Sequence, residues 1–288
     1  MQRLRDRVAL VTGASRGAGR GIAQVLGEEG ATVYVTGRSV RGGPTTGDLP
    51  ETVDGAAEQV IARGGTGIAV RCDHTVDAEV EALFERIKGE QGRLDLLVNN
   101  VWGGYENYES AEFDAPFWEQ PLWRWRGMFR AGLRAHYTAS RLAAPIMITQ
   151  RRGLIVNTTF WDRGKALGNL PYDLAKTAIN RLAYLLALEL QPHGVAAVAL
   201  SPGWMRTEEV LRHESATEED WQENPALART ESTAYIGRAV AALAADPDVM
   251  IKSGRTLTVG DLAREYGFTD VDGRQPPAYR MADEHLRD

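Results

Sequence analysis

Tyr172 and Lys176 are the two residues whose types and spacing most directly suggest chemistry. On a helix, a separation of four residues places the phenol and the ammonium on one face, one turn apart. A nearby cation stabilises the phenolate, so the tyrosine can exchange a proton well below its usual pKa of about 10. The pair is therefore suited to donate a proton to a carbonyl that is reduced, or to remove one from an alcohol that is oxidised.

A glycine-rich loop, TGASRGAGRG (12–21), lies between the first apolar strand and the first helical pattern. Gly13, Gly17 and Gly19 permit a tight turn, the close approach of a pyrophosphate, and contact between helix and strand. The N-terminus of the helix then faces the phosphates. This loop predicts a dinucleotide site, to which we also assign Ser15 and Arg16.

The end of the second strand distinguishes between the two nicotinamide dinucleotides. A carboxylate at this point binds the ribose 2′-hydroxyl of NAD(H), whereas arginine accommodates the 2′-phosphate of NADP(H). The chain reads Thr36-Gly37-Arg38-Ser39, without an acid, and Arg16 lies in the glycine loop. Because the planar fork of arginine suits phosphate, we expect NADP(H) to be favoured over NAD(H). The alternative is that both are ordinary surface arginines.

Further polar residues stand at the ends of later strands. Asp73 follows the third strand, where it is placed to contact the adenine amino group. Asn99 and Asn100 end the fourth strand, where their amides can brace the loop over the ribose. Thr159 ends the strand GLIVNTT, thirteen residues before Tyr172.

Short apolar strands alternate with helical patterns along the chain. The strands are RVALVT, ATVYVT, TGIAVRC, LDLLVNN, GLIVNTT, VAAVALS and RTLTV. Continuous runs of Val, Ile, Leu and Ala are typical of strands buried on both faces, as in a parallel sheet. We therefore predict an α/β fold, a doubly wound parallel sheet of Rossmann type, built as a single domain over 1–288.

Two polar stretches, residues 39–51 and 207–232, interrupt this alternation. Both follow carboxyl ends of strands, where ligands bind in α/β sheets, so we expect them to border the site. We interpret 207–232 as a lid; the alternative is that both stretches are solvated surface loops. Residues 261–288 form a C-terminal extension.

Composition narrows the class of protein. The formal charge of -6 argues against nucleic-acid binding, which usually needs a basic surface. The single cysteine excludes an internal disulfide, and no His, Asp or Glu grouping has metal-ligand spacing. No apolar run reaches the roughly 18 residues of a membrane span, and the N-terminus lacks a signal-peptide pattern. We expect a cytoplasmic enzyme that acts on a small molecule.

Together these features resemble the short-chain dehydrogenase/reductase family over essentially the whole chain. Its motifs appear in order as Gly13–Gly19, Asp73, Asn99–Asn100, Tyr172–Lys176 and Pro202–Thr207. The segments GRLDLLVNN, FWEQP, GLRAHY and DLAREYGFTDVDGR are similar to one subgroup of that family. The resemblance implies NADPH-dependent reduction of carbonyls over a broad range. It also implies that Pro202, Gly203 and Thr207 lie at the cofactor.

Departures from the family pattern concern the site itself. Thr159 stands where the family has a catalytic serine, and it keeps the hydroxyl while adding a methyl group. The family's asparagine on the preceding helix, which anchors a water near the lysine, is absent, and alignment through GLRAHY places Arg130 there. Val101 and Trp102 replace the small residues that follow the asparagine pair.

Trp102, Trp161 and Trp204 each follow a motif at a strand end. If the three converge on one cleft, they line a large aromatic substrate pocket. The alternative is that they fill the core or an interface.

The predicted reaction is hydride transfer between NADP(H) and a carbonyl or secondary alcohol. Tyr172 would be the general acid in reduction, Lys176 would lower its pKa and hold the nicotinamide ribose, and Thr159 would orient the substrate oxygen. Two alternatives stay open: an NADP(H)-binding sensor or scaffold with little turnover, and an enzyme that reduces imines. In similar proteins the helices over 121–149 and 172–191 pair between subunits, which implies a homodimer or homotetramer.

Overall fold

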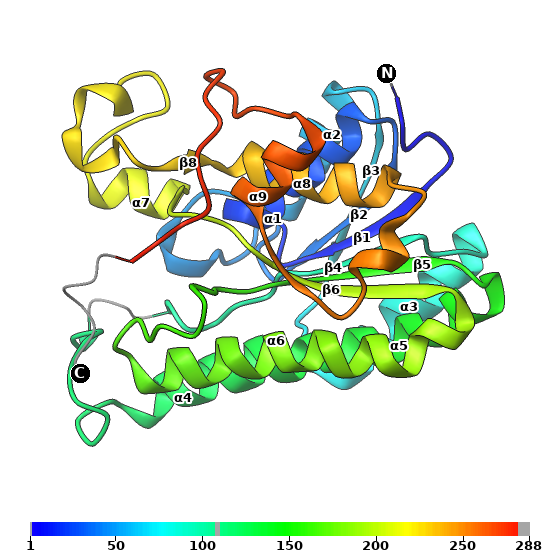
Figure 1. The fold of residues 1–288 in the computed structure, drawn as a ribbon, viewed down its shortest axis with the longest axis horizontal. Helices are drawn as coiled ribbons and strands as arrows, with labels where there is room; N and C mark the ends of the chain where they lie inside the picture. The colour runs from blue at the N-terminus through cyan, green and yellow to red at the C-terminus, as the bar shows by residue number, and fades with distance from the viewer. Residues whose placement is uncertain (1, 107–109, 282–288) are drawn as a thin grey trace.

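The protein is described by a computed structural model that covers residues 2–106 and 110–281. Seven parallel strands form one sheet in the order β3-β2-β1-β4-β5-β6-β9 (Figure 1). The strand bounds are β1 Val8–Thr12, β2 Thr32–Gly37, β3 Thr66–Arg71, β4 Leu96–Asn99, β5 Gly153–Thr158, β6 Val195–Ser201 and β9 Thr256–Thr258. The predicted doubly wound parallel sheet is confirmed.

Two hydrophobic cores lie on the two faces of the sheet, because successive side chains of each strand point to opposite faces. In β1, Val8 and Leu10 belong to one core and Ala9 and Val11 to the other. Figure 1 shows the two helical layers on either side of the sheet. One layer contains α1 (Gly17–Glu28), α2 (Val53–Ala62), α8 (Thr233–Ala245) and α9 (Val259–Tyr266), and the other contains α3 (Asp77–Gln91), α5 (Ala135–Gln150) and α6 (Leu170–Leu190).

The helix before β5 is interrupted by a π-helical turn. It comprises α4 (Leu122–Met128), the π turn Phe129–Arg134 and α5. The loop after β4 packs against this helix without intervening side chains, since a Cβ on Gly127 would lie 2.5 Å from the carbonyl oxygen of Gly103. π turns often occur at functional sites, and this one lies against the loop that carries Trp102.

The segment expected to form a lid is folded. It contains α7 (Glu208–His213) and the strand β8 (Glu231–Ser232), which pairs in parallel with β7 (Met205–Arg206). Its own small core consists of Leu211, Trp221 and Leu227. The role of this segment as a lid stays a prediction.

The C-terminal extension returns from α9 across the same layer. The buried carboxylate of Asp270 accepts hydrogen bonds from the backbone and hydroxyl of Ser232, where α8 begins. Farther on, the backbone N–H of Met281 donates to Asp162, 2.7 Å away. The extension is thereby attached at both ends of its described part, and residues 282–288 lie outside the described residues.

Candidate active site

Tyr172 lies in the first turn of α6, and the start of that helix is fixed by a side-chain cap. Asn169 is the N-cap residue, and its side-chain oxygen accepts a hydrogen bond from the backbone N–H of Tyr172 at 2.9 Å. Lys176 follows one turn later, and both side chains are buried, 5% and 9% exposed. The helix thus places phenol and ammonium on one buried face, as the spacing predicts.

Among the described residues, four aromatic rings lie around the ring of Tyr172. Trp102 meets it edge-on at 5.6 Å between centroids, and Phe113 and Phe160 lie at 5.7 and 5.9 Å. Tyr105 is nearly parallel to it at 6.4 Å. Burial raises the pKa of Tyr172 well above 10, and the neighbouring Tyr105 adds to this shift. In the free protein, the direction is therefore opposite to the one that the Tyr–Lys spacing alone predicts.

The ammonium of Lys176 is directed at Trp102. Its Nζ lies 3.7 Å from the Trp102 ring centroid and 5.6 Å from the ring centroid of Tyr172. Burial lowers the pKa of Lys176 to about 7, because a charged ammonium is poorly solvated in this position. At neutral pH, Lys176 is therefore without its proton in a substantial fraction of the molecules.

Thr159 is brought against the same helix from the end of β5. Its hydroxyl donates to the backbone carbonyl of Lys176 at 3.2 Å, and the side chain is buried. Its backbone N–H donates to Leu200 in β6. The three predicted catalytic residues are thus assembled in one place, although they come from two elements.

Close backbone contacts shape the glycine loop. Gly13 and Gly17 adopt positive φ of 64° and 57°, which favours glycine. A Cβ on Gly19 would lie 2.3 Å from the carbonyl oxygen of Gly13. Asn100 donates from its amide to that same carbonyl at 2.9 Å, so the end of β4 braces the loop. The side chain of Ser15 points toward Gly37 at the end of β2.

Carboxylates contact the positive groups of this loop. At the N-terminus of α1, Glu208 accepts from the backbone N–H of Gly17 at 2.7 Å and pairs with Arg20 at 3.0 Å. Arg16 lies 3.4 Å from Glu209. Helix N-termini and arginines attract anions, and glycine leaves the backbone accessible. These residues therefore fit the phosphates of a dinucleotide.

Arg38 also contacts a carboxylate. It forms an ion pair with Glu106 in the loop after β4, and both side chains are more than a third exposed. The 39–51 insertion lies beside these arginines, because Arg16 donates to the carbonyl of Thr46 at 3.0 Å. The insertion therefore borders the predicted 2′-phosphate site.

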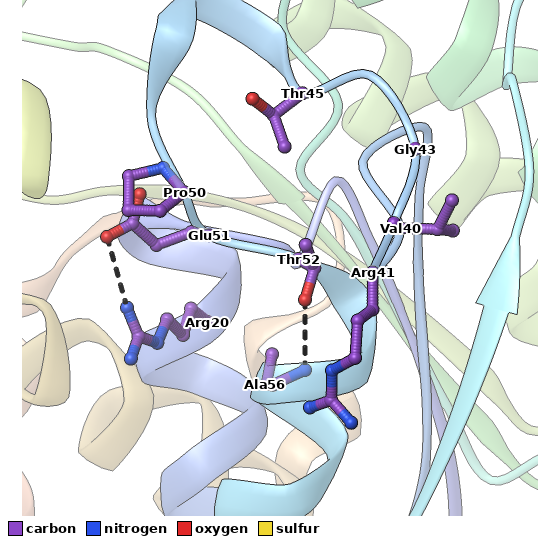
Figure 2. Close-up of a pocket in the computed structure, with 11 residues that line it drawn as sticks. Arg20, Val40, Arg41, Gly43, Thr45, Pro50, Glu51, Thr52 and Ala56 are labelled. Atoms are coloured by element: carbon purple, nitrogen blue, oxygen red, sulfur yellow. Dashed lines mark hydrogen bonds and ion pairs between the residues drawn. The ribbon is translucent and has the colours of Figure 1, made fainter.

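A cavity of about 420 Å³ lies between this insertion and the helices α1 and α2 (Figure 2). Arg20 and Glu51 approach each other to 3.9 Å along its wall. The backbone N–H of Ala56 donates to the carbonyl of Thr52 at the start of α2. Arg41 at its rim pairs with Glu58 at 2.7 Å. Its arginines are thus paired with acids of the same chain.

Asp73, Gly203 and Thr207 lie just after β3, β6 and β7, and their contact with the cofactor stays a prediction. Burial opposes the ionised form of Asp73, but hydrogen bonds from Thr75 hold the pKa of its carboxyl below the usual value. Gly203, directly after Pro202, donates its N–H to Glu231 at 2.9 Å, and burial raises the pKa of Glu231 to about 8.

The hydroxyl of Thr207 caps α7 by accepting from Val210. A Cβ on Gly17 would lie 3.6 Å from the methyl carbon of Thr207. The end of the Pro202–Thr207 motif therefore meets the glycine loop, which the sequence order alone cannot reveal.

The three tryptophans lie in different surroundings. Trp102 contacts Tyr172 and Lys176. Trp161 instead lines a cavity of about 210 Å³ with residues of β9 and α9, and Trp204 is 41% exposed. The pocket assignment of Trp161 and Trp204 stays a prediction. Sequence reasoning missed the other rings around Tyr172, because they lie in irregular loops without a motif or periodicity.

Within residues 2–106 and 110–281, no group of three or more His, Cys, Asp or Glu side chains is able to hold a metal ion. No helix in that part of the chain is long and apolar enough to cross a membrane.

In a sheet of this order, dinucleotides bind where the strand order reverses, which is between β1 and β4. Here Val101, just after β4, touches the glycine loop at Gly13, and the next residue, Trp102, touches Lys176. Dinucleotide site and Tyr–Lys pair are therefore neighbours, the arrangement expected of a dinucleotide-dependent oxidoreductase.

The chain belongs to the short-chain dehydrogenase/reductase family. The family model described as "Enoyl-(Acyl carrier protein) reductase" matches residues 13–260. The chain is 40% identical to human "Dehydrogenase/reductase SDR family member 1" over 96% of its own length and 87% of that protein's length. Membership supports hydride transfer as the general reaction.

Solved structures agree on the fold. A short-chain dehydrogenase of Mycobacterium thermoresistibile superposes with a TM-score of 0.80 at 25% identity, covering 97% of this chain and 95% of that one. A metagenomic short-chain oxidoreductase in complex with NADP superposes with a TM-score of 0.66 at 27% identity, covering 86% and 94%.

Arg130 is exposed and its guanidinium donates to the carbonyl of Thr75 at 3.4 Å. Other residues of this helix contact the site: Met128 is buried in one cluster with Tyr172, and a Cβ on Gly132 would lie 2.9 Å from the Trp102 ring. A π turn adds a residue to one helical turn and changes which side chains face the core. Arg130, the residue aligned with the family's asparagine, lies at the surface of this interrupted helix.

We expect Arg130→Asn to leave turnover unchanged or to raise it, without collapse of the fold. An exposed side chain of this kind contributes within about 0.5 kcal/mol to stability. Steady-state rates and the thermal midpoint measure both effects. Arg134→Asn is the control, because Arg134 is exposed on the same helix as Arg130 and this change removes only its ion pair with Asp77 at the start of α3. A tenfold loss of turnover confined to Arg130→Asn would contradict this placement.

Proposed function

We propose that the protein reduces carbonyl compounds, or oxidises secondary alcohols, with NADP(H) as its cofactor. The observation that carries this proposal is the buried assembly of Tyr172, Lys176 and Thr159 beside the glycine loop. A nicotinamide bound there supplies or accepts the hydride. The glycine loop, the N-terminus of α1 and Thr207 are the groups that would hold it.

Tyr172 is suited to hold the proton that reduction consumes. Burial keeps its phenol protonated, so the free site stores the proton on this residue. As the substrate oxygen gains negative charge, the Tyr172 hydroxyl transfers its proton to it, and the phenolate is left beside Lys176. The ammonium stabilises that phenolate until solvent returns the proton.

Thr159 is proposed to orient the substrate oxygen. The Thr159 hydroxyl donates to the backbone carbonyl of Lys176, and this hydrogen bond fixes the position of the hydroxyl beside α6. To donate to a substrate, the hydroxyl exchanges that bond for the new one. Serine at this position keeps the same hydroxyl, whereas alanine removes it.

NADP(H) is favoured over NAD(H) by the charges at the end of β2. Arg38 and Arg16 lie beside the 39–51 insertion, and each contacts a carboxylate of the protein. Because arginines bind carboxylates and phosphates in the same way, a 2′-phosphate would take the place of these carboxylates. A solved relative with NADP bound supports the same choice.

A second candidate function is an NADP(H)-binding sensor with little turnover. Tyr172 is only 5% exposed beneath its ring of aromatic side chains, which favours this alternative. Measurement of NADPH consumption over a panel of ketones, quinones and imines separates the two. Turnover of ketones or quinones supports the reductase, turnover of imines alone indicates an imine-reducing enzyme, and binding without consumption indicates the sensor.

A second copy of the chain is the proposed partner of the outer helical layer. Leu174, Leu185 and Leu188 on α6 are 44–53% exposed. Leu122 and Trp125 on α4 add to this apolar surface, at 70% and 39%. Pairing between copies would bury these side chains around a two-fold axis, giving a homodimer or homotetramer.

NADP(H) is expected to bind more tightly than NAD(H). Each charge-assisted contact to the 2′-phosphate contributes roughly 1.5–3 kcal/mol, or about ten- to hundredfold in affinity. Arg38→Asp should reverse the preference, measured by fluorescence titration with both cofactors. Arg63→Asp is the matched control, because Arg63 pairs with Glu28 at the C-terminal ends of α2 and α1, away from the glycine loop, and should leave the ratio unchanged. Equal affinity of the unmodified protein for the two cofactors would sink the assignment.

Tyr172→Phe should lower turnover by roughly 10²–10⁴, with cofactor binding nearly intact, since the ring stays and the proton donor is lost. Thr159→Ser should keep most activity, and Thr159→Ala should not. Rates are measured on a ketone identified in the NADPH panel. Full activity of Tyr172→Phe on that substrate would show that the proton comes from elsewhere.

Leu185→Glu combined with Leu188→Glu should yield monomers, because two charges are placed on the proposed interface. Light scattering at micromolar concentration gives the mass, against 31.6 kDa for one chain. Ile61→Glu is the control, as Ile61 is 56% exposed on α2 in the opposite layer. A monomeric mass for the unmodified protein would contradict the proposed assembly.

A further inference from the structure

Lys176 has an aromatic face as a close neighbour of its charge. The distance of 3.7 Å from Nζ to the Trp102 ring centroid is well inside the roughly 6 Å limit of a cation–π contact. The side chain is 9% exposed, and burial alone accounts for its lowered pKa. A charge in such a position needs support from nearby groups, and the face of an indole provides it without a charge of its own.

Two glycines make room for the Trp102 ring. A Cβ on Gly132, in the π turn, would lie 2.9 Å from two ring carbons, and a Cβ on Gly104 would lie 2.7 Å from Nε1. Contacts this short are not compatible with a side chain at either position. The loop is also anchored one residue earlier, since His136 donates from Nε2 to the carbonyl of Val101 at 3.2 Å. The indole is therefore held in a fixed slot.

The same indole contacts both members of the Tyr–Lys pair. Its face is turned to the ammonium of Lys176, and Tyr172 meets it at an interplanar angle of 84°. The buried Nε1 of Trp102 has no hydrogen-bond partner among the described residues. Contacts of the indole ring therefore hold Trp102 in place, and they offset the free-energy cost of the hydrogen bond that its Nε1 does not form.

We propose that Trp102 is a positioning residue, whose indole face holds the ammonium of Lys176 charged and in place beside Tyr172. The role rests on the proposed function, because the charge of Lys176 matters to the reaction only if Tyr172 exchanges a proton. It differs from a pocket wall, since the contact is with the lysine rather than with a substrate.

Removal of the ring face should lower the pKa of Lys176. A buried cation–π contact contributes about 1–2 kcal/mol, and about 1.4 kcal/mol corresponds to one pKa unit. In the described part of the chain, two titratable groups lie near Lys176: His136 on the neighbouring helix α5 and Tyr172 on its own helix α6. Burial, reinforced by the Lys176 charge, lowers the pKa of His136 on α5 to about 3, and burial raises that of Tyr172 well above 10. Neither changes charge between pH 5 and 9, so the lysine titrates alone.

Isotope-labelled lysine allows a direct test by NMR in the free protein. The chain has four lysines, so the spectrum is simple, and loss of one signal in Lys176→Arg assigns Lys176. Trp102→Leu keeps apolar volume without a ring face, and should lower the pKa of Lys176 by about one unit. Trp102→Phe should lower it by less, with the other three lysines as internal controls.

Fluorination offers a variant that preserves shape. Fluorine withdraws electron density from the indole face, so 5-fluorotryptophan in all seven tryptophans should lower the pKa of Lys176. The same labelling in a Trp102→Phe background should produce no further shift, which assigns the effect to position 102. A pKa that stays unchanged or rises in folded Trp102→Leu and in the fluorinated protein would overturn the proposal.

This titration needs neither cofactor nor turnover. Its failure therefore removes Trp102 from the proposed role and leaves the hydride-transfer proposal standing. Conversely, full activity of Tyr172→Phe would overturn the proposed chemistry while the cation–π contact stays measurable.

Discussion

The close approach of backbones at the ends of β1 and β4 is the constraint on which the site depends. Gly13 leaves no room for a Cβ beside Val101, and Gly19 leaves none beside the carbonyl of Gly13. Asn100 then bonds that carbonyl. Because β4 ends against the glycine loop in this way, the next residue, Trp102, is delivered to the Tyr–Lys pair. A side chain at either glycine would move the dinucleotide loop and the lysine's neighbour together.

Electrostatics attaches the 207–232 segment to the same loop. The N-terminus of α1 carries a partial positive charge. Its backbone N–H at Gly17 donates to the carboxylate of Glu208, which lies where a phosphate is expected. Arg20 holds the same carboxylate. A dinucleotide whose phosphates bind at Gly17 must exchange these bonds for its own, so its affinity includes the cost of releasing Glu208. Release of Glu208 would in this way couple the acidic start of α7 to cofactor binding.

Sequence patterns predicted the framework well, and the site less completely. Apolar runs predict parallel strands because both faces of the sheet are buried, and the glycine loop and Tyr172–Lys176 carry spacing that only one local geometry satisfies. The aromatic rings around Tyr172 come from loops of no fixed period, so no pattern groups them before the chain is folded. The outward placement of Arg130 was hidden for a related reason, since a π turn over Phe129–Arg134 changes the helical phase and so changes which side chains face the core.

Burial shifts the pKa values of Tyr172 and Lys176 in opposite directions, and both shifts favour the uncharged form of the side chain. It raises the pKa of the phenol and lowers that of the ammonium, so each group is driven toward its neutral form. Proton donation from Tyr172 leaves a phenolate, which is acceptable in this apolar cluster only if Lys176 is charged at that moment. Before the phenolate forms, groups without a charge of their own can support this ammonium. The face of Trp102 is such a group, and an apolar site can in this way keep an ammonium ready beside a phenol that holds its proton.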